Sequence, residues 1–197
     1  RYWSSDGRVD PAKYWDSDAF EMRIKDKPTN QDEAGTLLSH GWKWVSASEL
    51  PKTDKGARHF VVELSNSIMP VGVKIHTLLD GTPVLARWLE ITNSGAKPVA
   101  LTELSPWCGR LWSGDAEFAL GHALRSDIMW EGWFGWTALK SGNNTFGNAK
   151  GLSPDDPYFV LRNDSNGECF LGQLGWSANY SMEFDKDNGL AFKIGPT

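Results

Sequence analysis

Apolar residues recur at every second position through most of residues 58–104, and short turn motifs interrupt them. In "VGVKIHTLL" (residues 71–79) the valines and the isoleucine fall on one face of an extended chain, and the lysine and the histidine fall on the other. "RHFVVELSN" and "VLARWLEIT" alternate in the same way, as a β-strand does because successive side chains point to opposite faces. The motifs "DGTP" and "NSGAKP" supply the Asp, Asn and Pro of tight turns, with Gly at positive φ. This region therefore predicts consecutive antiparallel strands.

The rest of the chain follows the same pattern. Five further segments read as strands: "AEFALGHAL", "PYFVLRN", "ECFLGQLGW", "YSMEF" and "LAFKIG". The motif "NDSNGE" at residues 163–168 predicts a hairpin turn. Helix signals are confined to "DPAKYWDSDAF" and "SASELPK", and the polar, glycine-rich residues 138–157 are expected to form a loop. The sequence predicts an all-β, antiparallel sandwich of one domain, residues 1–197, with at most one or two short helices.

Charge and composition exclude several classes of partner. The net charge is −5 and the basic residues are scattered, so neither a nucleic acid nor an anionic membrane is an expected partner. No apolar run approaches the roughly 20 residues that span a bilayer, and no secretory signal pattern is present. Glycosylation patterns occur at Asn143, Asn163 and Asn179, but the compartment stays open. Cys108 and Cys169 could form one bridge or remain thiols.

No motif for catalysis, a metal or a cofactor is present. A glycosidase needs two facing carboxyl groups, and no pair stands out among 25 acidic residues. Four carboxylates lie near aromatic positions: Glu90, Glu103, Asp127 and Glu131. The four histidines, among them His76 and His122, lack the short spacings of a zinc site. No catalytic residue, metal ligand or cofactor is therefore predicted.

Tryptophan is the abnormal feature of the composition, with 11 residues. The segments "SPWCGRLW" and "IMWEGWFGW" gather Trp112, Trp130, Trp133 and Trp136 around Phe134. The glycines in "WEGWFGW" suit a loop that displays rings, and a sugar can stack its C–H face on an exposed ring. These four tryptophans are the predicted carbohydrate-binding residues, with core packing as the alternative.

Arg87 and Trp88 lie side by side in a predicted strand, so their side chains point to opposite faces. They cannot form one site. Arg87, on an otherwise apolar face, is expected to have a fixed partner or a covering element.

Two sequence blocks resemble the N-terminal domain of the family 36 glycoside hydrolases, the α-galactosidases. The block "HTLLDGTPVLARWLEITNSGAKPVALTEL" (76–104) resembles their strand, "DG-P-L-R" turn and "E-TN-G-PV-L" pattern. The block "GLSPDDPYFVLRNDSNGECFLGQLGWSANY" (151–180) looks like their "G-S-P-F-L", "GE" and "G-LGWSGN". One departure is "SAN" in place of "SGN" at residues 177–179, so substrate choice is expected to differ.

The resemblance implies a β-supersandwich of the galactose-mutarotase type, which precedes a catalytic (β/α)8 barrel in those retaining enzymes. None of that barrel is in this sequence, so no residue inherits a catalytic role, and the chain is expected to be a fragment of a longer glycoside hydrolase. The implied partners are a galactoside-like carbohydrate and the downstream barrel, and loops of this domain can also support a homo-oligomer. A free-standing carbohydrate-binding module and a mutarotase-like epimerase using His76 or His122 remain alternatives.

Overall fold

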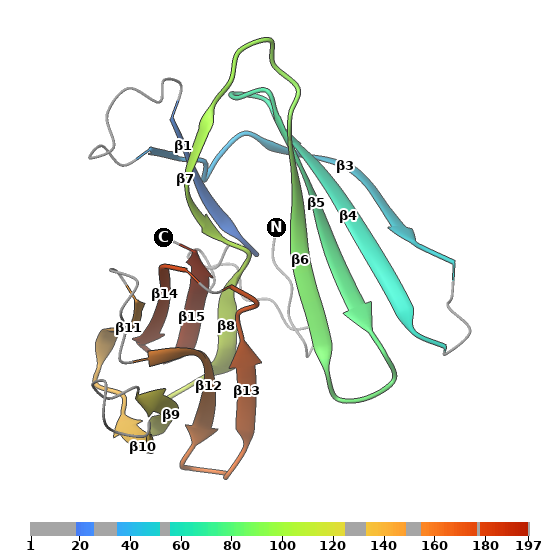
Figure 1. Cartoon of the computed structure of the whole chain (residues 1–197). Helices are drawn as coiled ribbons and strands as arrows, with labels where there is room; N and C mark the ends of the chain where they lie inside the picture. The colour runs from blue at the N-terminus through green and yellow to red at the C-terminus, as the bar shows by residue number, and fades with distance from the viewer. Residues whose placement is uncertain are drawn as a thin grey trace. The chain divides into compact units, whose positions relative to one another are not determined.

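The computed structural model describes residues 19–25, 35–51, 56–124, 133–148, 155–176 and 178–196 (Figure 1). Within these ranges every regular secondary-structure element is a β-strand. None of the described residues forms a helix long and apolar enough to cross a membrane. The chain divides into two compact units. The N-terminal unit is Glu21–Trp107, and the C-terminal unit joins Cys108–Thr197 to Arg1–Phe20. Each unit has its own antiparallel sheets, which confirms the all-β antiparallel prediction.

The N-terminal unit contains a four-stranded and a three-stranded sheet. The larger sheet has the order β3-β4-β5-β6, and the smaller has the order β2-β1-β7. Their strands are β1 (Glu21–Lys25), β2 (Thr36–Leu37), β3 (Trp42–Glu49), β4 (Arg58–Asn66), β5 (Val71–Leu79), β6 (Leu85–Asn93) and β7 (Ala100–Ser105). Val71, Val73 and Ile75 are buried on one face of β5, as their alternation predicts.

Both predicted turns of this unit are present. In the turn between β5 and β6, the Asp80 carboxylate accepts the Thr82 backbone N–H at 2.9 Å, and Gly81 has a φ of +89°. In the turn after β6, the Asn93 side chain accepts the Gly95 N–H at 2.9 Å. Gly95 does not have the positive φ that the sequence predicts. It is needed for space instead, because a Cβ there would lie 2.6 Å from Pro70 Cγ.

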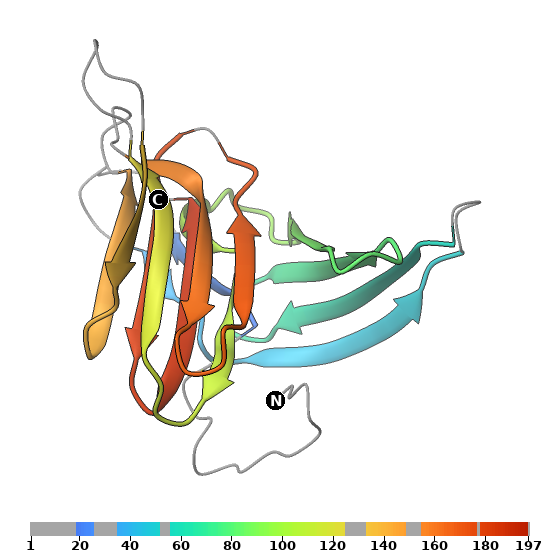
Figure 2. The same cartoon turned by 90° about the horizontal axis from the view of Figure 1, so that it is seen from below.

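The C-terminal unit is a sandwich of two four-stranded sheets (Figures 1 and 2). One sheet has the order β10-β9-β12-β13 and the other has the order β11-β14-β15-β8. Their strands are β8 (Trp107–Ser113), β9 (Phe118–Leu124), β10 (Trp133–Ala138), β11 (Gly142–Asn148), β12 (Asp155–Asn163), β13 (Cys169–Gln173), β14 (Tyr180–Lys186) and β15 (Gly189–Pro196). Phe159 and Phe184, from facing sheets, meet edge to face with ring centroids 5.1 Å apart.

The core of this unit lies between the two sheets. Alternate residues of β9, β12, β14 and β15 turn inward and are almost fully buried, among them Phe118, Leu161, Met182 and Leu190. Each such side chain contributes about 1.5–3 kcal/mol of stability by leaving water. The period-two pattern of the sequence thus places these residues correctly.

Two local predictions from the sequence are wrong, and a third concerns residues outside the described ranges. "SASELPK" is not a helical turn, because residues 46–49 continue β3 and pair with β4 across a bulge. Residues 138–157 are not one loop, because β11 and the start of β12 lie within them. β11 pairs with β14 from Gly142 to Asn148, so inter-strand hydrogen bonds override the loop-like composition. The helix predicted in "DPAKYWDSDAF" falls mostly on residues 11–18, outside the described residues.

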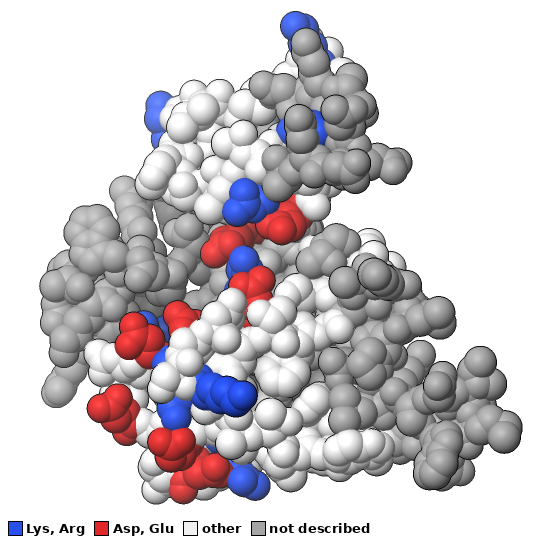
Figure 3. All heavy atoms as spheres, turned by 90° about the vertical axis from the view of Figure 1, so that its left-hand side faces the viewer, with Lys and Arg blue, Asp and Glu red and all other residues white. Residues whose placement is uncertain are grey.

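Charged side chains of both signs are mixed on the face that Figure 3 shows. Ion pairs among the described residues include Arg23 with Glu103 at 2.7 Å and Lys193 with Glu183 at 3.4 Å. These pairs are partly exposed, so each adds at most about 1 kcal/mol. Mixed charge of this kind does not provide the single-signed surface that binds a polyanion.

Candidate functional site

The predicted carbohydrate-binding tryptophans do not lie together in a loop. Trp133 and Trp136 belong to strand β10, which pairs with β9 from Trp133 opposite Leu124 to Ala138 opposite Ala119. Gly135 leaves space for a ring of the same strand, because a Cβ at Gly135 would lie 2.2 Å from the Trp133 ring. Trp130 lies outside the described residues. The predicted ring-displaying loop is therefore a strand at Trp133 and Trp136.

Strand geometry separates Trp133 from Trp136. They are three positions apart, so their side chains point to opposite faces of the sheet. Trp133 shares the inner face with Gly135, whose partner His122 contacts Phe146 of the facing sheet. Trp136 lies on the outer face. Both are exposed, at 57% and 46%, but they cannot contact the same ring of a ligand.

Trp136 forms the centre of an outer-face surface, which we call the aromatic platform: Phe134, Trp136 and Arg162. Phe134 and Trp136 meet edge to face at 5.5 Å, and the Arg162 guanidinium lies 4.3 Å from the Trp136 ring centroid. Strand β9 runs between β10 and β12 and places only small residues on this face, among them Ala119 and Gly121. A Cβ at Gly121 would lie 2.4 Å from the Phe134 ring. Both rings therefore lie over β9, with their planes nearly perpendicular to each other.

Arg162 is held in place from a second side. Its guanidinium pairs with the Asp164 carboxylate, and the pKa of Arg162 is raised, chiefly by that hydrogen bond. A fixed cation over an indole is worth about 0.5–1 kcal/mol at an exposed site. Sequence reasoning missed Arg162, because it lies 26 positions from Trp136 and only the register of β9 and β12 brings the two together. The platform combines exposed rings with a fixed hydrogen-bond donor.

Trp112 is a packing residue rather than a displayed ring. Its indole N–H donates to the Glu168 carboxylate at 3.0 Å, and its ring lies 5.4 Å from that of the buried Phe118. Glu168 belongs to the predicted hairpin between β12 and β13, which is confirmed by the bond from Asn163 N to Glu168 O at 2.9 Å. Hydrogen bonds from Trp112 and Asn166 lower the pKa of the Glu168 carboxyl. Trp112 thus ties β8 to this hairpin.

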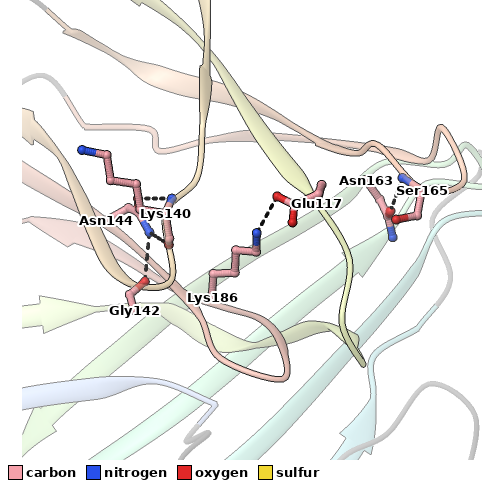
Figure 4. A network of polar contacts seen from close by, with 7 residues as sticks. All are labelled: Glu117, Lys140, Gly142, Asn144, Asn163, Ser165 and Lys186. Carbon is pink, nitrogen blue, oxygen red and sulfur yellow. Dashed lines mark hydrogen bonds and ion pairs between the residues drawn. The ribbon is translucent and has the colours of Figure 1, made fainter.

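A polar hollow of about 280 Å³ lies among the turns before β9, before β11 and between β14 and β15. Asp115, Asp185 and Lys186 are among its lining residues. Figure 4 shows the contacts that shape these turns: Lys186 Nζ lies 2.7 Å from Glu117 Oε2, and the Asn144 side chain donates to the Lys140 and Gly142 carbonyls at 2.8 and 2.9 Å. None of the described residues that line the hollow is aromatic, so they offer hydrogen bonds without a stacking surface.

The two candidate acid–base groups that the structure describes, Glu90 and Glu103, are each paired with a basic side chain. Glu103 is held by Arg23 and Glu90 by Lys74 at 3.0 Å, while Asp127 and Glu131 lie outside the described residues. A glycosidase acid requires a raised pKa. The described carboxyl groups whose pKa departs from its ordinary value are Asp80, Glu90 and Glu168, and all three are lowered by hydrogen bonds. No group of three or more metal-binding side chains occurs among the described residues.

Neither candidate histidine of an epimerase presents its ring to a sugar. His122 is 5% exposed, and its Nε2 lies 3.1 Å from Thr137 Oγ1. The His76 side chain is 12% exposed. Its Nδ1 lies 3.0 Å from His59 Nε2, and its Nε2 lies 3.5 Å from Glu90 Oε2 without hydrogen-bond geometry. Both ring nitrogens of His76 therefore face protein groups.

The structure also shows the surroundings of Arg87, of both cysteines and of the glycosylation pattern at Asn163. Arg87 has the fixed neighbour that the sequence predicts, because its guanidinium lies 5.9 Å from the Trp107 ring centroid. Cys108 is buried and Cys169 is exposed, and no disulfide joins them. Asn163 is 6% exposed and its side chain accepts the Ser165 N–H (Figure 4), which leaves it inaccessible for glycosylation.

The fold matches solved α-galactosidase structures. The galactosidase domain of the α-galactosidase–sucrose kinase AgaSK gives a TM-score of 0.73 at 20% identity, covering 89% of this chain and 26% of that one. The α-galactosidase of Lactobacillus brevis gives 0.66 at 14% identity, with 89% and 25% covered. The family 36 α-galactosidase AgaA of Geobacillus stearothermophilus, in complex with stachyose, gives 0.67 at 13% identity, with 91% and 26% covered.

These matches confirm the fold that the sequence resemblance implies. The chain folds like one part of the family 36 α-galactosidases and spans about a quarter of the length of the chains that it matches. No protein-family model matches the sequence, and no curated protein matches it.

Proposed function

We propose that this chain is a noncatalytic domain of an α-galactosidase-like glycoside hydrolase. It supports a catalytic barrel encoded downstream in the same polypeptide and helps to shape a carbohydrate site. The observation that carries this proposal is the coverage: about nine-tenths of this chain corresponds to only a quarter of each α-galactosidase chain. The lowered pKa values of Asp80, Glu90 and Glu168 do not suit the general-acid role, because a carboxylate held ionised cannot protonate a leaving group.

The aromatic platform is the part of the C-terminal unit that we assign to carbohydrate. Sugars present C–H groups on one face and hydroxyl groups at the rim, and Trp136 and Arg162 offer partners for both. The indole is positioned before any ligand binds, by Arg162 on one side and Phe134 at its edge. Pre-positioned rings lose little conformational freedom on binding, which favours affinity.

The first experiment tests the noncatalytic assignment. The 197-residue chain is expected to leave an aryl α-galactoside unhydrolysed, and the polypeptide extended through the downstream region is expected to hydrolyse it. Turnover by the 197-residue chain alone would refute the assignment. An extended protein without α-galactosidase activity would refute the proposed parent class and favour a free-standing carbohydrate-binding module that uses the platform.

The second experiment tests the platform by isothermal titration of the 197-residue chain with galactosides. Trp136→Ala is expected to weaken binding by at least about tenfold, or about 1.4 kcal/mol. Trp176→Ala is the matched control, because Trp176 is also 46% exposed but lies outside the platform, with its indole N–H bonded to Asn179 O at 3.0 Å. Equal effects of the two substitutions would contradict a role for the platform.

A further inference from the structure

Three rings gather on one face of the β3-β4-β5-β6 sheet in the N-terminal unit. The His76 and Trp88 positions face each other on β5 and β6, and their ring planes are nearly parallel, 7° apart with centroids at 4.8 Å. The His59 ring from β4 lies 5.0 Å from the Trp88 ring and hydrogen bonds with His76 at 3.0 Å. Alternation along each strand places these residues on one face, but only the strand register makes them neighbours.

The Trp88 ring is fixed on one side and open on the other. His76 stacks on one face of the indole, while β6 is the last strand in the order of its sheet. Trp88 remains 41% exposed, although burial of an indole is strongly favourable. The ring is therefore held in place at the sheet edge without being buried. A rigid aromatic side chain in this position can stack on a ligand at little entropic cost.

A fixed ion pair lies beside the ring on the same face. Glu90 follows Trp88 by two positions on β6, so both side chains point the same way, and the Lys74 position lies directly opposite Glu90 on β5. Lys74 Nζ is 3.0 Å from Glu90 Oε1, and His76 Nε2 is 3.5 Å from Glu90 Oε2. Lys74 first, and His76 second, lower the pKa of the Glu90 carboxyl.

We propose that Trp88, Glu90 and Lys74 form a second saccharide-binding surface, in the N-terminal unit, which takes a neutral pyranoside. The C–H face of the sugar stacks on the open face of Trp88. One ring hydroxyl donates to the Glu90 carboxylate, and its neighbour accepts from the Lys74 ammonium. His59 and His76 do not touch the sugar. They position the indole and the carboxylate.

The chemistry of the face favours a neutral sugar over charged ligands. Glu63 also lies on this face, opposite Lys74 on β4, and accepts a hydrogen bond from Ser46 at 3.3 Å. Two carboxylates therefore surround one ammonium group, which disfavours phosphates, nucleic acids and anionic lipids. The open ring gives the face an apolar component as well. A paired carboxylate and ammonium beside an aromatic ring match the alternating donors and acceptors of vicinal hydroxyls.

The test is a titration of the 197-residue chain, labelled with ¹⁵N at tryptophan, with methyl α-D-galactopyranoside and methyl α-D-glucopyranoside. The Trp88 indole signal is identified by its absence from the spectrum of Trp88→Phe. We expect this signal to shift saturably with at least one of the two sugars. Glu90→Gln is expected to weaken that response at least tenfold while the remaining indole signals keep their positions, which shows an intact fold.

Two control variants distinguish binding at this surface from binding at other exposed tryptophans. Trp44 is 51% exposed on the same sheet, but it lies opposite Leu64 and so points to the other face, and Trp44→Ala is expected to leave the Trp88 titration unchanged. Trp136→Ala, which removes the aromatic platform, is also expected to leave it unchanged.

A Trp88 signal that does not move at sugar concentrations up to about 100 mM would overturn the proposal. So would a Trp88 response that Glu90→Gln leaves intact. A response of the Trp136 signal alone would overturn this second surface and support the aromatic platform. A response of the Trp88 signal alone would support this second surface and contradict the aromatic platform.

Discussion

Gly172→Ala tests the packing between β13 and the core of the C-terminal unit. Gly172 lies directly opposite Phe159 in the β12–β13 pair, and the Phe159 ring crosses the space where a side chain would be. A Cβ at Gly172 would lie 2.3, 2.7 and 2.9 Å from three atoms of that ring. Carbon atoms pack best at about 3.5–4.0 Å, so the ring would have to move by more than about 1 Å.

The ring has no free space in which to move. Phe159 is 1% exposed, and its ring packs edge to face against Phe184, which is fully buried. Overpacking of this kind costs about 1–3 kcal/mol. Replacing Gly by Ala also restricts the unfolded chain, which stabilises the protein by about 0.4–1 kcal/mol. The expected net loss in the free energy of unfolding is therefore about 1–2 kcal/mol.

Urea unfolding, followed by tryptophan fluorescence, measures this loss. Gly175→Ala is the matched control, three residues along the chain, because a Cβ there meets nothing within 4 Å and its φ is not left-handed. It is expected to be neutral or slightly stabilising. In a Phe159→Leu background, where the ring is gone, Gly172→Ala is expected to cost at least about 0.5 kcal/mol less. If Gly172→Ala is as stable as Gly175→Ala, Phe159 does not occupy the position described above.

Two further predictions concern the same unit. Phe184→Ala removes a ring with no exposed surface that contacts Phe159 and Phe146, and is expected to lower the free energy of unfolding by about 3–5 kcal/mol in the same urea assay; a loss below about 1 kcal/mol would contradict the sandwich core. The Glu168 carboxyl, whose pKa is lowered by Trp112 and Asn166, contributes stability that is present above its ordinary pKa near about 4.3 and is lost as pH falls through its lowered value. Unfolding of Glu168→Gln is therefore expected to depend less on pH below about 4 than unfolding of the unmodified chain, and identical pH profiles would exclude this role.

Strands whose alternation was strong were predictable from the sequence alone. Val71, Val73 and Ile75 are buried on one face of β5, and "NDSNGE" forms the hairpin between β12 and β13. Both depend on local chemistry: the two-residue period of a strand and the turn preferences of Asn and Gly. The polar segment that contains β11 was missed, because its strand is stabilised by pairing with β14, some 40 positions away in sequence (Gly142 opposite Lys186).

The candidate sites were predictable only in part. Composition directed attention to tryptophan, and Trp136 is exposed beside Phe134. The grouping was wrong, since β10 turns Trp133 and Trp136 to opposite faces and Trp112 is bonded to Glu168. For the strand that holds Arg87 and Trp88, the sequence predicts a fixed partner or a covering element for Arg87 and no site shared by the two side chains. Arg87 does contact Trp107, yet Trp88 remains exposed beside His76.

The sequence by itself determined the class of the fold, because period-two alternation and turn chemistry act between residues that are neighbours along the chain. It also determined which face of each strong strand carries which side chains. Only the tertiary structure decided which faces meet. Arg162 lies over Trp136, and His59 bonds to His76, because strands far apart in sequence pair in one particular register. A shift of that register by one residue would send each of these side chains to the opposite face.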